Sequence, residues 1–219
     1  MCEASVVTNT CDIFDAHAAF CLPSERAAAA PVRSSLHASH LDTAPVTTNP
    51  HTQFASYREM LLEHLLVGEI MRRLWLRGIT QFEVLKPQVD DSGYDLVLEA
   101  NGIVRHVQLK SSFKAATTRQ AMASVKLGTK PSACVVWVHF DPETLTLGPF
   151  LWFGNEPGKP IPPLDSLKVA KHVRANSQGV KGERPGQRVI PRALFRQVND
   201  LDGLVTRLFG EFKVDPPPT

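Results

Sequence analysis

The segment DLVLEANGIVRHVQLK, residues 95–110, constrains the fold of this chain more than any other stretch. Asn101-Gly102 separates two runs in which apolar and polar residues alternate. This dipeptide favours a two-residue type I′ turn, because both central residues of such a turn need a positive φ. The sequence therefore predicts a β-hairpin in which Ala100 pairs with Ile103.

The turn fixes the register of the two strands and so decides which side chains share a face. Continuing the pairing away from the turn puts Asp95 opposite Gln108. Gly93 then faces Lys110, which leaves open space beside the ammonium group. Because side chains alternate along a strand, Asp95, Gln108 and Lys110 are expected on one face. The other face carries the apolar residues Leu96, Leu98, Val107 and Leu109.

The sequence around the hairpin predicts an α/β protein. A helix over 57–77 is indicated by a capping box of Ser56 and Glu59 and by Gly78 at its end. A second helix is expected over 117–128, and strands are expected at QFEVL, SACVVWVHF and GPFLWFG. The order helix, three strands, helix, strand predicts a sheet with a helix on each side.

The ends of the chain differ in composition from its centre. Residues 1–55 are rich in Ala, Ser, Thr, Pro and His without periodicity, which predicts a disordered extension before a domain at 56–212. Residues 154–191 show no regular pattern, and 213–219 are expected to be a disordered tail. Before that tail, a C-terminal helix is predicted from an apolar stripe of Leu201, Leu204, Val205, Leu208 and Phe209.

A glutamate accompanies the leucines of the first predicted helix. With Leu62 at zero on a helical wheel, Glu69 falls near about −20°, inside the stripe that also holds Leu65, Leu66 and Leu76. Burying a carboxylate is costly unless it is paired or coordinated. Arg73, one turn on, could pair with Glu69. Glu63 falls near about 100° on the same wheel and is the poorer candidate for a site.

These residues together resemble a nuclease superfamily. Gly68-Glu69 in a helix ending LRGI, then SGYDLVLE, then RHVQLKSS, is similar to the PD-(D/E)XK superfamily, and within it to small bacterial and phage members whose third motif has the form QxK. The match covers residues 56–140. The resemblance implies an α/β fold with a restriction-endonuclease-like core: αβββαβ, a central mixed sheet flanked by helices, here with a C-terminal helical addition.

The resemblance also implies a catalytic site and a cofactor. Glu69, Asp95 and Gln108 would bind Mg²⁺, with Mn²⁺ as a substitute, and Lys110 would activate water. A hard cation held by oxygen atoms lowers the pKa of bound water and polarises a phosphate. The implied activity is that of a Mg²⁺-dependent endodeoxyribonuclease that hydrolyses phosphodiester bonds in DNA.

Gln108 departs from the main pattern of the superfamily, which has a carboxylate at this position. A neutral amide oxygen lowers the negative charge of the site, so Mg²⁺ should bind more weakly. A second hypothesis is therefore a nucleic-acid-binding protein of the same fold with weak or no turnover. A third is that Glu69 and Arg73 form a structural ion pair and that the hairpin has no chemical role.

A basic segment follows the apolar strands. The segment from Lys159 to Arg196 contains nine basic residues and only two acidic ones, Asp165 and Glu183. This composition is typical of a loop that contacts phosphates or of a solvated surface loop. Ser111 and Ser112 follow Lys110 and could donate to a phosphate or simply end a strand. The predicted nucleic-acid contacts are these two serines together with Lys171, Arg174, Lys181, Arg184 and Arg188.

Charge, cysteine spacing and apolar runs indicate the compartment and the kind of partner to expect. Residues 1–55 sum to −3 and the remainder to +5, which is compatible with a polyanionic partner. The four cysteines have no CxxC spacing, which disfavours a zinc site or a disulfide framework and favours a reducing compartment. No signal peptide or membrane span is evident in the sequence, so we expect a cytoplasmic protein without membrane contact. Cleavage of both DNA strands would suit a homodimer.

Overall fold

The computed structural model describes residues 49–89, 91–172, 174–175 and 177–212. Disorder is predicted for 1–55 and 213–219, and of these, residues 1–48 and 213–219 lie outside the described ranges, as do three of the four cysteines. Residues 49–55 are described and are largely helical, so the prediction is wrong there. Helix α1 (Pro50–Gln53) precedes the predicted start of the domain. In the described part of the chain, no helix combines the length and apolar composition that crossing a membrane requires.

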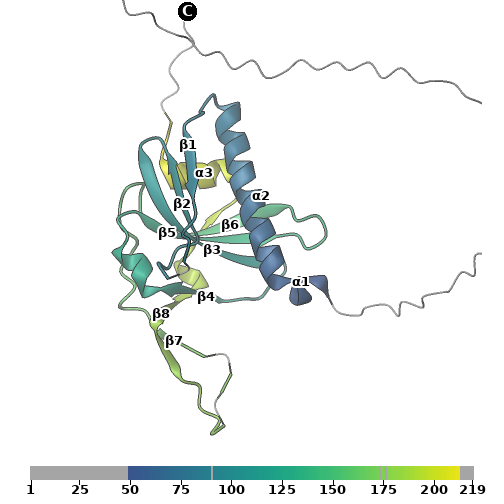
Figure 1. The fold of residues 1–219 in the computed structure, drawn as a ribbon, viewed down its shortest axis with the longest axis vertical. Coiled ribbons are helices and arrows are strands. Elements are labelled where there is room, and N and C mark those ends of the chain that lie inside the picture. The colour runs from purple at the N-terminus through teal and green to yellow at the C-terminus, as the bar shows by residue number, and fades with distance from the viewer. Residues whose placement is uncertain (1–48, 90, 173, 176, 213–219) are drawn as a thin grey trace, which may run out of the picture. The chain divides into compact units, whose positions relative to one another are not determined.

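A six-stranded mixed sheet forms the centre of the protein (Figure 1). Its strand order is β1-β2-β3-β5-β6-β9, in which β3 and β5 run parallel and every other neighbouring pair is antiparallel. The strands are β1 (Phe82–Leu85), β2 (Leu96–Ala100), β3 (Ile103–Phe113), β5 (Ala133–Phe140), β6 (Leu147–Gly154) and β9 (Arg196–Val198).

The hairpin of β2 and β3 has the predicted register. Ala100 pairs with Ile103, and the regular pairing continues to Leu96 and Val107. Asn101 and Gly102 have φ values of 54° and 69°, as a type I′ turn requires. The register prediction is therefore confirmed along β2.

Two helices cover one face of this sheet. Helix α2 (Ala55–Leu76) buries Leu62, Leu66, Ile70 and Leu74, and α3 (Leu201–Phe209) buries Leu204, Val205, Leu208 and Phe209. The hairpin also holds the C-terminal end of α3, because Arg105 donates to the carbonyls of Leu208 (2.9 Å) and Arg207 (3.0 Å). No side chain caps α2 at Phe54, so the predicted capping box does not form.

A second, three-stranded sheet packs on the other face, in the order β4-β8-β7. The helix predicted over 117–128 is wrong: this segment forms β4 (Gln120–Ser124) and a short 3₁₀ helix, η1 (Val125–Thr129). Ala121 and Ala123 are buried against the sheet, and β4 pairs over five residues with β8. Pairing and burial here outweigh the helical propensity of alanine.

The segment predicted to be irregular also contains strands. β7 (Val169–Lys171) pairs with β8 (Glu183–Pro191) at Glu183, Arg184 and Arg188, and both strands belong to the second sheet. Between the two layers lies a second apolar core that includes Trp137, Phe153 and Phe195.

Cys134 is buried and free, and burial raises the pKa of its thiol to about 12, so it stays protonated.

Two glycine substitutions should have opposite effects on stability. Gly102→Ala should lower the free energy of unfolding by about 1–2 kcal/mol, because alanine is strained at positive φ. Gly68→Ala should raise it by up to about 1 kcal/mol, since Gly68 lies inside α2 and a Cβ there meets no atom within 4 Å. Urea unfolding followed by circular dichroism measures both changes. Equal stability of the two variants would contradict the assigned turn.

Candidate functional site

A cavity of about 460 Å³ opens between the first half of α2 and the point where β2 begins. Carboxylates and ammonium groups from four segments line it together with apolar side chains. The lining residues are Glu59, Met60, Leu62, Glu63, Lys86, Asp95, Leu109, Lys110, Ser111 and Val138. The structure thus brings Asp95 and Lys110 of the predicted site to one cavity.

Asp95 lies where the chain leaves the sheet. Its N–H donates to the carbonyl of Val107 (2.9 Å), and its carboxylate accepts a hydrogen bond from the N–H of Leu109 (2.6 Å). These two bonds fall on either side of Gln108, so the carboxylate takes the place of a strand partner along the edge of β3. A side chain held this way has a fixed position at the cavity wall.

Gly93 does not lie beside Lys110 as the extended register predicted. It turns away with φ 79°, and a Cβ built on it would lie 2.7 Å from Cβ of Ser124. The prediction fails because the regular ladder ends at Leu96. The open space next to Lys110 comes instead from the absence of β2 along the rest of β3.

The two serines after Lys110 have different surroundings. Ser111 lines the cavity. Ser112 points to the other side of β3, where its Oγ accepts a hydrogen bond from Nε1 of Trp137 (2.9 Å). Only Ser111 is therefore placed to contact a ligand in the cavity.

Helix α2 supplies two carboxylates to this cavity, Glu59 and Glu63. Glu59 is 65% exposed and lies 3.6 Å from Arg58, so Glu63 is the more enclosed of the two. Its side chain is 14% exposed, and its Oε1 lies 2.6 Å from Nζ of Lys86, which follows β1. Both residues line the cavity with Asp95 and Lys110. Sequence analysis ranked Glu63 below Glu69, and the structure reverses that order.

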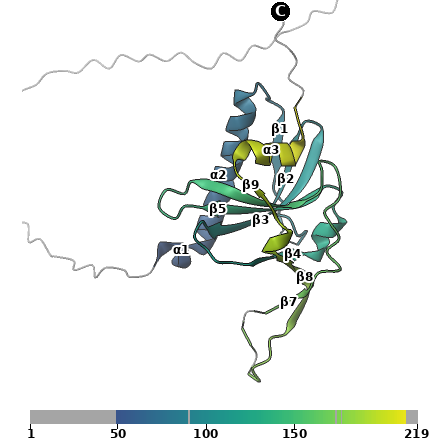
Figure 2. The same ribbon diagram turned by 180° about the vertical axis from the view of Figure 1, so that it is seen from behind.

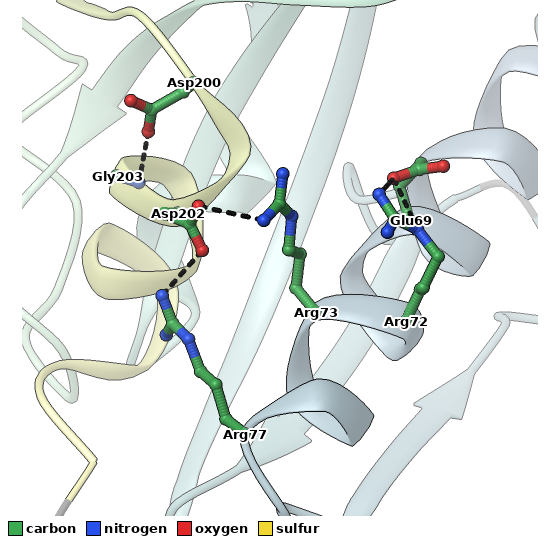
Figure 3. A network of polar contacts seen from close by, with 7 residues as sticks. All are labelled: Glu69, Arg72, Arg73, Arg77, Asp200, Asp202 and Gly203. Carbon is green, nitrogen blue, oxygen red and sulfur yellow. Dashed lines mark hydrogen bonds and ion pairs between the residues drawn. The ribbon is translucent and has the colours of Figure 1, made fainter.

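Glu69 does not reach this cavity. It is 43% exposed and pairs with Arg72 at 2.7 Å (Figure 3). It lines a different cavity, together with Leu145 and Asp200. Six residues separate it from Glu63, which is about 9 Å along a helix axis.

The predicted ion pair between Glu69 and Arg73 does not form either. Arg73 instead points to α3, where it pairs with Asp202 at 3.2 Å (Figure 3). Arg77 reaches the same carboxylate at 2.7 Å. These two pairs join α2 to α3, so this part of α2 has a structural role.

The helical wheel failed because it left out two buried residues. Ile70 and Leu74 are 0% and 1% exposed, and with Leu62 and Leu66 they form a buried stripe centred at about +60°. Leu65 is only partly buried and Leu76 is exposed, although the wheel placed both in the stripe. Glu63, at about 100°, then lies within the stripe, whereas Glu69 lies at its margin. Apolar residues occur on every side of this helix, so its sequence alone does not indicate which of them face the sheet.

Gln108 is buried next to the site. It is 7% exposed, it does not line the cavity, and its Oε1 has no hydrogen-bond partner among the described residues. A buried oxygen without a partner costs about 1–3 kcal/mol, and a water or cation would remove that cost. In the described residues, no group of three or more His, Cys, Asp and Glu side chains could hold a metal ion.

The predicted basic contacts divide into two sets. Lys171, Arg174 and Lys181 are exposed around the ribbon formed by β7 and β8, and Arg184 is half-buried on β8. Arg188 is different, because it donates to the carbonyl of Pro185 and to that of Gln187. Its predicted role in nucleic-acid binding is the least supported of the five.

Comparisons with known proteins reveal only one weak structural similarity for this chain. No protein-family model matches the sequence, and no curated protein matches it. Among solved structures, the chain is similar to a bacterial homing endonuclease, I-Ssp6803I, with 23% sequence identity and a TM-score of 0.24. The similarity covers 54% of this chain and 78% of that chain. Values this low define neither the fold nor the activity of the chain.

A neutral histidine lies behind the site. His139 on β5 is 2% exposed, stacks on Trp137, and has its Nε2 3.1 Å from Nη1 of Arg192. A guanidinium can only donate, so Nε2 accepts and the ring is neutral. Burial, and secondarily Arg192, lower the pKa of His139, and burial also lowers the pKa of His106.

Stability should therefore fall on mild acidification. In the unfolded chain these histidines bind protons at a pH of about 6.5, whereas in the folded chain they bind them only at lower pH. The free energy of unfolding should be highest above this pH and should decrease as the pH falls below it. Urea unfolding at pH 7.5, 6.5 and 5.5 measures the slope. His139→Gln should make it shallower, and an unchanged slope in that variant would contradict the assignment.

Proposed function

We propose that the protein is a metal-dependent nuclease that hydrolyses phosphodiester bonds in DNA at the cavity between α2 and β3. The observation that carries the proposal is that Glu63, Asp95 and Lys110, from a helix, a strand start and a neighbouring strand, line one cavity. These three residues offer two carboxylates and an ammonium group, which suit a divalent cation next to a phosphate.

The oxygen atoms at the cavity fit a hard cation. Glu63 and Asp95 would hold Mg²⁺ or Mn²⁺. Gln108 does not line the cavity, so its unpartnered Oε1 would contribute only through a bridging water. Mg²⁺ usually takes one or two protein carboxylates and keeps several waters, so this small set is sufficient. When bound, the cation polarises the phosphate and lowers the pKa of a bound water.

The remaining cavity residues act on the substrate. Lys110 places a compact positive charge against the phosphoryl oxygens, on which negative charge builds as the water oxygen bonds to phosphorus and the ester bond breaks. Ser111, next along β3, can donate to a phosphate oxygen. The bond from Leu109 to Asp95 keeps the carboxylate oriented while charge shifts in the cavity.

Lys86 competes with a cation for Glu63. Its ammonium group pairs with Glu63 at 2.6 Å, so a cation and Lys86 compete for the same carboxylate. The lining contains three carboxylates, Glu59, Glu63 and Asp95, against two ammonium groups. Metal binding should therefore be weak and sensitive to either lysine.

The alternative function is a DNA-binding protein of the same fold without turnover, as Gln108 in place of a carboxylate suggests. It differs from the nuclease in metal uptake, because a binder would hold DNA without Mg²⁺ or Mn²⁺. Assembly as a homodimer stays a prediction for both functions.

The first test separates Glu63 from Glu69. Glu63→Gln, Asp95→Asn and Lys110→Ala should each lower the rate of Mg²⁺-dependent plasmid nicking by about 10²-fold or more, since each removes charge that acts on the cation or the transition state. Glu69→Gln is the matched control on the same helix and should nick like the parent. Circular dichroism checks that each variant is folded.

Two outcomes of that test would contradict the proposal. If Glu69→Gln lost activity while Glu63→Gln kept it, the assignment of the helix ligand would be wrong. If the parent nicked no DNA with either Mg²⁺ or Mn²⁺, the nuclease function itself would be wrong.

The second test measures metal binding without DNA. Titration calorimetry with Mn²⁺ should show uptake by the parent and weaker uptake by Glu63→Gln. Lys86→Met should bind Mn²⁺ several-fold more tightly, because the carboxylate of Glu63 loses its competing ammonium group. Identical affinities in the parent and both variants would exclude Glu63 as a ligand. DNA retention by a parent that takes up no Mn²⁺ would support the binder.

A further inference from the structure

The strands β7 and β8 form a two-stranded ribbon that extends beyond the body of the protein (Figures 1 and 2). β8 pairs with β4 only from Gln187 to Pro191, whereas Glu183 and Arg184 pair only with β7. The pairing continues past β7, because the N–H of His172 donates to the carbonyl of Gly182 (2.9 Å). The ribbon therefore leaves the sheet and has both edges open.

Charge on this ribbon is strongly one-sided. Residues 168–186 contain five basic residues and one acidic residue, Glu183, for a net charge of +4. Lys168, Lys171 and Lys181 are exposed. In the described residues, none of the basic side chains in this segment forms an ion pair with a carboxylate.

The basic side chains on the body behave differently. Arg72, Arg73, Lys86, Lys126 and Arg207 each pair with a carboxylate within 4.0 Å. Other cations of the body, such as Lys114 and Lys159, have no such pair among the described residues, but carboxylates are interspersed with them along the chain. The ribbon differs from the body in that its unpaired cations are concentrated in one protruding segment with a single carboxylate (Figure 1), which suits a partner outside the chain. A polyanion is the partner with complementary charge.

The shape of the ribbon selects among polyanions. The major groove of B-form DNA is about 12 Å wide and admits a two-stranded β-ribbon. The major groove of an A-form RNA duplex is too narrow and deep for one. Extended single strands present no groove, so they would gain only from charge.

We propose that the ribbon of β7 and β8 enters the major groove of duplex DNA, with Lys171 and Lys181 against phosphates on the groove walls. The proposal rests on the function proposed above and adds the substrate class, which is double-stranded B-form DNA. The ribbon would then anchor the duplex while the cavity of Glu63, Asp95 and Lys110 receives one of its phosphates.

The test compares two variants that lose the same charge. Lys171→Ala/Lys181→Ala removes two cations of the ribbon, and Arg72→Ala/Lys159→Ala removes two exposed cations of the body. Binding of a short DNA duplex is measured by fluorescence anisotropy without divalent cations, at several salt concentrations. The ribbon variant should bind at least about ten-fold more weakly, with a salt slope smaller by up to about two, and the body variant should bind like the parent.

A second arm tests the groove itself. A duplex whose pyrimidines carry bulky 5-substituents has a blocked major groove, because that position faces the groove. The parent should lose affinity for this duplex, and the ribbon variant should lose much less. Equal affinity of the parent for blocked and unblocked DNA, or for an RNA duplex of the same sequence, would overturn the proposal.

The outcomes also separate this inference from the nuclease function. A parent that binds duplex through the ribbon but never nicks it would refute the nuclease and leave the inference standing. A parent that nicks DNA, with a ribbon variant that binds as tightly as the parent, would refute the inference and leave the nuclease standing.

Discussion

The turn at Asn101 and Gly102 is the constraint on which the rest of the structure depends. Positive φ at both residues allows only one pairing of β2 with β3, and a shift by one residue would exchange the buried and exposed faces of both strands. With this register, Leu96, Leu98 and Val107 lie under α2. The same end of the sheet then holds the last residue of β1, the first of β2 and the middle of β3.

The candidate site exists because β2 begins late. β3 continues to Phe113, whereas its antiparallel partner starts at Leu96 opposite Val107, so part of one edge of β3 has no strand beside it. An edge of this kind exposes backbone N–H groups that need acceptors. The carboxylate of Asp95 provides one of them, and the side chain is fixed in the opening by the same bond. The missing strand beside β3 thus leaves an opening in which the carboxylate of Asp95 has a fixed position.

Local patterns in the sequence were sufficient to predict the hairpin and the buried strand over 132–140. They also indicated that Asp95 and Lys110 lie near each other. Turn geometry and alternation are short-range properties, so neighbouring residues determine them. Local patterns were insufficient where distant segments decide. Residues 120–124 form a strand only because β8 lies beside them, and nothing near them in sequence indicates this. Glu63 depends on which side of α2 meets the sheet, and the sequence does not indicate that side because apolar residues lie all around this helix. The strands β7 and β8 could not be predicted, because the glycines and prolines of this segment are typical of irregular loops.

Charge is organised differently in the two regions that a nucleic acid would contact. In the cavity, Lys86 and Lys110 nearly balance the carboxylates, so the site presents little net field until a cation changes that balance. On the ribbon five basic residues accompany one carboxylate, Glu183, and none forms an ion pair in the part of the chain that the structure describes. Their field extends into solvent over about 8–10 Å at physiological salt. A long-range attraction that does not depend on the catalytic groups can hold a polyanion near the cavity. The cavity can then remain selective for the geometry of a single phosphate, since it does not have to supply the affinity for the whole duplex.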